Sequence, residues 1–231
     1  TGPSTGWQAG SGLIWRRNAY DFIECYATVP LPCPVPSAFL DSTAVAVLAT
    51  LTYANVSDYL YSRQGTEYGY NGEYGSMTLG SDTRYTRHEL FWKYYYLFDG
   101  RPHENLETQF RLGLSSGSMY LSDEYAYSLG GNRSLRAYES SAVTGNAYFL
   151  VNLQYLRPFF GHYPLRGVIF LDVGNAYPSI ERMHLGKVLW DVGAGLRFRL
   201  KSFVKIDLRL DFAYSPASGE TRTFLGTKEL F

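Results

Sequence analysis

The stretch VLWDVGAGLRFRL, residues 188–200, decides the fold because its side chains alternate strictly between two kinds. In an extended chain one face carries Val188, Trp190, Val192, Ala194, Leu196, Phe198 and Leu200, and the other carries Leu189, Asp191, Gly193, Gly195, Arg197 and Arg199. A two-residue period is that of a β-strand. A strand with one apolar face and one charged face is typical of a membrane β-barrel, in which apolar side chains meet lipid and polar ones line a wet lumen.

The same alternation recurs along the chain. In residues 205–214, Ile206, Leu208, Leu210, Phe212 and Tyr214 alternate with Lys205, Asp207, Arg209 and Asp211. Further strands are predicted within residues 5–29 and at residues 43–55, 65–78, 83–97, 104–116, 144–157, 165–175 and 221–231. We therefore predict an all-β fold in which residues 1–231 form a single transmembrane antiparallel barrel of about ten strands, with twelve as the alternative.

Composition supports this interpretation. The slightly negative mean hydropathy would suit a soluble β-sandwich equally well, but 21 Tyr and 14 Phe favour the aromatic girdles of a barrel. The longest apolar run, residues 44–51, is about eight residues long and too short for a membrane helix. The formal net charge of zero gives no indication of a nucleic-acid partner. The first residues lack a signal sequence, so we expect that any such segment has been removed.

The connections between predicted strands differ in length. Residues 201–202 make a tight link, whereas residues 117–144 and 175–187 make long ones, as expected for short periplasmic turns and long outer loops. The Pro-rich residues 30–36 also fall on the outer side when the C-terminus is placed in the periplasm. Cys25 and Cys33 lie beside this loop. They are expected to form a disulfide that closes it, with two unrelated thiols as the alternative.

Three motifs follow one another in the second half of the chain: LGGNRSLRAY at residues 129–138, FLDVG at 170–174 and GAGLR at 193–197. In this order, and with Phe231 at the end of the last strand, they resemble the BamA and two-partner secretion transporter superfamily. The first motif resembles the glycine pair and V-R-G-[YF] element of that family. Leu135 and Ala137 stand where the family has Val and Gly.

The resemblance implies a specific structure for the long loop. In the family this loop folds back into the lumen, and its arginine docks on an aspartate of the barrel wall. Carried over, Arg136 would dock on Asp172, which alternation independently places in the lumen. The implied loop motif consists of Gly130, Gly131, Leu135, Arg136, Ala137 and Tyr138. The implied docking wall consists of Phe170, Asp172, Gly174, Gly193, Gly195 and Arg197, and Phe231 would be the terminal assembly signal.

No enzymatic or metal chemistry is predicted. GLSSG at residues 113–117 satisfies the G-x-S-x-G pattern, but it ends an amphipathic strand rather than forming the strand-to-helix turn that a nucleophile requires. The histidines are scattered without ligand spacing, and His103 and His162 are expected to be solvated in periplasmic turns. We expect no catalytic residue, no metal and no cofactor.

The resemblance also implies a function and its alternatives. It implies a barrel in the outer membrane of a Gram-negative-type bacterium that promotes insertion or passage of polypeptides or lipids, with a polypeptide client or a periplasmic partner. Residues 1–231 leave no room for the client-binding POTRA domains of full family members. A structural or passive transport barrel that has lost this machinery is therefore the alternative. A barrel completed by pairing with a second copy, as a homodimer, is a third, because an open strand edge in lipid is costly.

Overall fold

Ten strands form one antiparallel sheet. The computed structural model describes residues 4–18, 42–59, 61–117, 125–159, 161–200 and 206–227. The sheet has the order β1-β2-β3-β4-β5-β8-β9-β10-β11-β12. Each strand therefore pairs with the sheet strands that come before and after it in the chain. The strands are β1 (Ser4–Asn18), β2 (Ser42–Asp58), β3 (Arg63–Gly75), β4 (Tyr85–Leu97), β5 (Asn105–Gly117), β8 (Ala147–Phe159), β9 (His162–Tyr177), β10 (Leu189–Leu200), β11 (Ile206–Tyr214) and β12 (Thr221–Gly226).

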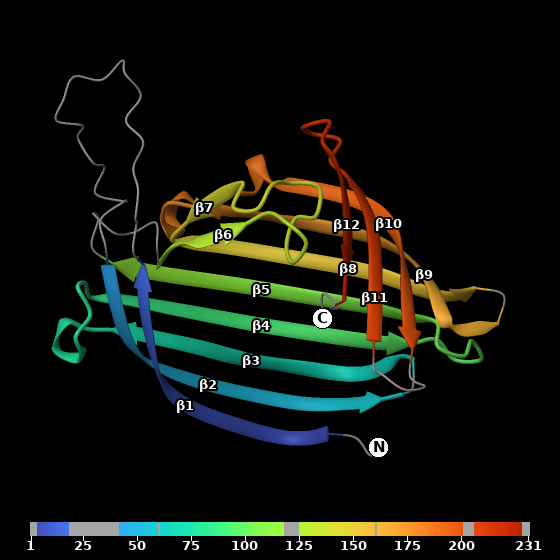
Figure 1. Cartoon of the computed structure of the whole chain (residues 1–231), viewed down its shortest axis with the longest axis horizontal. Helices are drawn as coiled ribbons and strands as arrows, with labels where there is room; N and C mark the ends of the chain where they lie inside the picture. Colours follow the sequence, from blue (N-terminus) through green and yellow to red (C-terminus); the bar gives the residue numbers. More distant parts are fainter. Residues whose placement is uncertain are drawn as a thin grey trace.

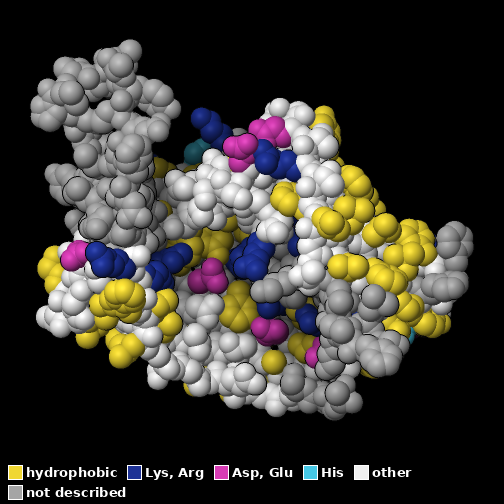
Figure 2. All heavy atoms as spheres, in the orientation of Figure 1, with side chains coloured by type: hydrophobic (Ala, Val, Ile, Leu, Met, Phe, Trp, Pro, Cys, Tyr) yellow, Lys and Arg dark blue, Asp and Glu magenta, His cyan; other side chains and the backbone are white. Residues whose placement is uncertain are grey.

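The sheet curls around a central space. In Figure 1, β2 to β5 run nearly horizontally, whereas β10, β11 and β12 run steeply across the picture. Its outer face is apolar: Ile169 on β9 is 60% exposed, and Phe212 on β11 is 50% exposed. On the same two strands, Asp172 and Asp211 point to the inner face and are fully buried. Figure 2 shows charged side chains gathered in the central hollow and hydrophobic ones over β9 and β10. The predicted transmembrane antiparallel barrel of ten strands is confirmed.

The predicted long loop contains structure that the sequence did not indicate. Within residues 117–144 lies β6 (Tyr127–Leu129), which pairs with β7 (Val143–Gly145) as a separate two-stranded sheet. This hairpin closes the base of the loop formed by residues 130–142. The strand predicted at 144–157 accordingly begins later, at Ala147. The strand predicted at 221–231 ends at Gly226, and Phe231 lies outside the described residues.

The short turns at one end of the barrel contact one another. The Oγ of Ser62 lies 3.1 Å from Nδ1 of His103, and the rings of His103 and Tyr163 lie 4.8 Å apart. His103, which was predicted to be solvated in a periplasmic turn, is partly buried, because the turn before β3 and the start of β9 pack against its ring. The helices are single turns, η2 (Met77–Leu79), η3 (Ile180–Arg182) and η4 (Leu185–Lys187). No helix in the described part of the chain is long and apolar enough to cross a membrane.

Candidate functional site

The loop between β6 and β7 has its own hydrogen-bonded structure. The Oγ of Ser134 accepts from the Gly130 backbone N–H at 2.7 Å and donates to the Gly130 carbonyl at 2.9 Å. The Gly131 N–H donates to the carbonyl of Tyr138 at 3.0 Å. Gly130 has a φ of 122°, and a Cβ built there would lie 1.8 Å from the carbonyl oxygen of Glu139. The first glycine of the pair is therefore required by both its backbone conformation and the close approach of the returning chain.

Gly130→Ala is expected to disrupt this loop, because the added methyl group must displace the Glu139 backbone. We expect faster proteolysis within residues 130–142 and a lower unfolding temperature in semi-native gels. The matched control is Gly219→Ala, since Gly219 also has a positive φ of 73° but nothing lies within 4 Å of its added Cβ. Equal effects of the two substitutions would show that backbone strain alone matters.

Arg136 is the centre of the site. Its side chain is fully buried, with Nε donating to Oδ2 of Asp172 at 2.6 Å and Nη2 donating to Oδ1 at 2.8 Å. Its guanidinium carbon lies 3.4 Å from the ring centroid of Phe170. A planar guanidinium can make a bidentate pair and stack on an aromatic ring at the same time, which a lysine cannot do. The structure thus brings the loop arginine and the wall aspartate together.

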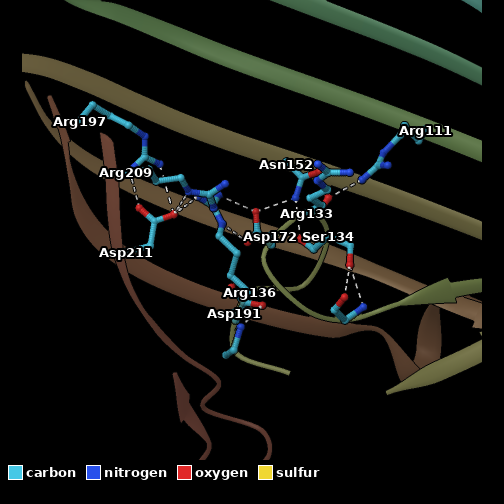
Figure 3. A network of polar contacts seen from close by, with 12 residues as sticks. Arg111, Arg133, Ser134, Arg136, Asn152, Asp172, Asp191, Arg197, Arg209 and Asp211 are labelled. Atoms are coloured by element: carbon cyan, nitrogen blue, oxygen red, sulfur yellow. Dashed lines mark hydrogen bonds and ion pairs between the residues drawn. The ribbon is translucent and has the colours of Figure 1, made fainter. Parts of the chain in front are cut away.

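A second aspartate extends this contact across the lumen (Figure 3). Nη1 of Arg136 lies 3.3 Å from Oδ2 of Asp211 on β11. Asp211 also accepts from Arg197 through Oδ1 and from Arg209 through Oδ2, each at 2.5 Å. The buried charged side chains grouped around the docked guanidinium are, with Arg136 itself, three arginines and three aspartates: Arg136, Arg197, Arg209, Asp172, Asp191 and Asp211. Their formal charges cancel, which is the condition for stable burial of so many ions.

The backbone of the loop is held as well as its arginine. Nδ2 of Asn152 on β8 donates to the carbonyl of Ser134 at 2.8 Å and to Oδ1 of Asp172 at 2.7 Å. The Ala137 N–H donates to Oδ2 of Asp191 on β10 at 3.2 Å. The hydroxyl of Tyr138 lies 2.7 Å from Oγ of Ser215. These contacts attach one short loop to β8, β9, β10 and the end of β11.

Apolar side chains of the loop pack against the same part of the wall. Leu135 and Ala137 are fully buried and belong to a cluster that includes Leu150 and Phe170 from the wall. The two positions that depart from the family pattern are therefore occupied by side chains that fit the interior. Gly193 leaves room for the ring of Phe170, since a Cβ there would lie 2.2 Å from its Cζ.

The structure places most of the predicted site residues in this one region. Arg197 was predicted to belong to the wall on which the loop docks, but its side chain contacts Asp211 rather than the loop. Phe231, Cys25 and Cys33 lie outside the described residues. Sequence reasoning missed the roles of Asp211, Asp191, Asn152 and Ser215. Alternation placed the two aspartates in the lumen, but it does not specify which side chains meet across it.

The G-x-S-x-G match has the geometry of a strand. Ser115 lies within β5, and its Oγ is 3.2 Å from Oδ1 of Asn146. A nucleophile elbow requires a sharp turn between a strand and a helix, which this position does not make. Within the described ranges, no three His, Cys, Asp or Glu side chains are grouped as a metal site requires.

An antiparallel transmembrane barrel whose long loop docks inside the lumen through a buried arginine defines the class of this protein. The Omp85 superfamily domain matches residues 17–224, which is most of the chain. The chain therefore belongs to the Omp85 superfamily.

A solved structure has the same fold. BamA from Haemophilus ducreyi, in a crystal structure lacking POTRA domains 1–3, is similar with a TM-score of 0.63 and 16% sequence identity. The similarity covers 80% of this chain and 42% of the BamA chain, so the matched part corresponds to less than half of that chain. At this identity the likeness concerns the fold alone. No curated protein sequence matches the chain.

Proposed function

We propose that the protein promotes insertion of polypeptides into, or their passage across, the outer membrane of a Gram-negative-type bacterium, with the Arg136–Asp172 pair as the lock of its inward-folded loop. The observation that carries this proposal is the complete burial of Arg136 against Asp172 in the lumen. Its client is an unfolded polypeptide, supplied directly or by a periplasmic partner.

The loop fills the lumen unevenly, and this supports a role for the loop in client insertion. The loop makes most of its contacts with the wall from β8 to β11, and its hydrogen bonds to β4 and β5 are fewer: Tyr127 donates to the His88 carbonyl, and Arg111 donates to the Arg133 carbonyl. A space of about 300 Å³ remains beside β2, β3 and β4. Glu73, Arg87 and Glu89 line this space together with Tyr127 of the loop hairpin. The loop thus leaves the part of the lumen beside β2, β3 and β4 unfilled, and charged side chains line it. Space left inside the lumen suits a barrel that must admit a client strand.

The lock could instead serve stability alone, in a structural or passive transport barrel. A buried network with balanced charge favours this second function too, because it provides rigidity without a moving part. The two functions differ in whether the protein accelerates the assembly of another protein.

Reconstitution in liposomes tests the proposal. Liposomes carrying the protein should assemble an added unfolded barrel client faster than empty liposomes, as measured by the growth of the protease-protected fraction. Arg136→Ala should lower this rate, and the charge-matched control Arg182→Gln, in the exposed helix η3, should leave it unchanged. A rate equal to that of empty liposomes would contradict the proposal and favour the passive barrel.

A further inference from the structure

The outer face of the barrel carries a groove across β8, β9, β10 and β11. It has a volume of 850 Å³ and is mostly apolar. The strand registers align one row of its lining across the four strands: Tyr155, Ile169, Ala194 and Phe212. The next row toward the short turns contains Arg157, Gly167 and Leu196.

The hollow results from small residues set between large ones. Gly167 and Ala194 occupy outward-facing positions with no side chain or a small one, so the surface between the larger side chains is recessed. The ring of Phe159 folds over Gly167, where a Cβ would lie 2.7 Å from its Cζ. The side chains of Tyr155, Leu196 and Phe212 form the sides of the groove. Such a groove fits an acyl chain better than the convex surface of an ordinary barrel does.

The end of the groove near the short turns is cationic. The side chain of Arg157 is 71% exposed on the outer face, only two residues before the end of β8. In the turn between β4 and β5, the side chain of Arg101 is 63% exposed. Both arginines contact the buried Glu104, at 3.7 Å and 2.8 Å, so the three groups together carry one net positive charge.

A polar hollow of 400 Å³ lies between these charges. Arg101, Glu104 and Tyr163 line it, and it shares Arg157, Pro158 and Gly161 with the apolar groove. The two spaces are therefore adjacent, with Arg157 between them. An arginine on the lipid face costs roughly 2–4 kcal/mol at the bilayer midplane but about 0–1 near the interface, which places this end at headgroup depth.

We propose that this groove is a binding site for one glycerophospholipid of the adjacent leaflet. An acyl chain would lie along Ile169, Ala194 and Phe212, and the phosphate would accept hydrogen bonds from Arg157 and Arg101. Guanidinium groups bind phosphate oxygens with charge-assisted, often bidentate, hydrogen bonds. The single net positive charge matches the single negative charge of the phosphodiester. This site is independent of the loop lock and of the proposed function.

Native mass spectrometry of the detergent-purified full protein with added phosphatidylglycerol tests this site. We expect one lipid to stay bound at collision energies that strip the rest. Arg157→Gln should weaken this binding about tenfold, which corresponds to about 1.4 kcal/mol and is less than a typical charge-assisted hydrogen bond contributes. Ala194→Phe, which fills the groove without changing charge, should abolish it. Arg182→Gln is the matched control at the other end of the barrel and should bind as the wild type does.

Three outcomes would overturn the proposal. Equal lipid retention by Arg157→Gln, Ala194→Phe and wild type would identify non-specific annular lipid. Displacement of the lipid by millimolar inorganic phosphate would identify a phosphate site without a role for the acyl groove. A dimer that Ala194→Phe dissociates would show that a second copy covers the groove. Heat-dependent gel mobility confirms that each variant is folded before its binding is compared.

Discussion

Arg136→Ala is expected to lower the free energy of unfolding by roughly 3–5 kcal/mol, the cost of breaking a buried ion pair from one side. The removed guanidinium is the charge partner of Asp172 inside the lumen. Asp191 is the residue directly opposite Asp172 in the pairing of β9 with β10. Without Arg136, two facing carboxylates remain in a confined space, and like charges on opposed residues repel.

Asp172→Ala is expected to cost less than Arg136→Ala. Arg136 keeps a second carboxylate at 3.3 Å, that of Asp211, so its charge stays partly compensated. The freed Asn152 amide retains the carbonyl of Ser134 as an acceptor. A loop that acted only through one pair would instead give two equal losses.

A double-mutant cycle measures the coupling directly. Because both substitutions break the same contact, the double variant should be little worse than Arg136→Ala alone. Arg133→Ala is the matched control, since Arg133 is an exposed arginine of the same loop. Its effect should stay within about 0.5 kcal/mol. Urea unfolding in bilayers gives the energies, and proteolysis within residues 130–142 reports on the loop. Additive losses, or Arg136→Ala equal to Arg133→Ala, would leave no lock.

Much of the fold could be predicted from local alternation, because a strand between lipid and lumen must change polarity at every residue. The inward positions of Asp172, Asp191 and Asp211 follow from this rule alone. The rule does not give the partners, since these depend on the register of strands that are distant in sequence. The contact of Arg136 with Asp211 joins residues 75 positions apart and depends on the curvature of the sheet, which brings β11 to the docked loop.

The contact of Arg136 with Asp172 could be anticipated only through the family resemblance. Nothing in the composition of residues 129–138 distinguishes a docked loop from a solvated one. The β6–β7 hairpin was missed for a related reason: strands of three residues carry too few alternations to be recognised. Its two strands are separated in sequence by the docked loop that contains Arg136.

Leu210→Arg is expected to cost roughly 2–4 kcal/mol, the cost of an arginine at the middle of a barrel's lipid face. Leu210 lies at the centre of β11 and pairs on the same outer face with Leu196 and Leu225. Its neighbour Arg209 points the other way and donates to Asp211 at 2.5 Å in the lumen. Arginine is therefore stabilised at one position and would be stranded in lipid at the next.

Depth provides the matched control. Tyr214→Arg introduces the same charge on the same face of the same strand, but at its last residue, where an arginine reaches the interface. We expect this variant to lose about 0–1 kcal/mol. Unfolding of both variants in phosphatidylcholine bilayers, followed by tryptophan fluorescence, gives the comparison. In water the two positions would be equivalent exposed sites, so equal losses would mean that this face of β11 does not meet the interior of a bilayer. A larger loss at Leu210 requires a hydrocarbon layer centred on the strand, with the charged network of Arg136 on its other side.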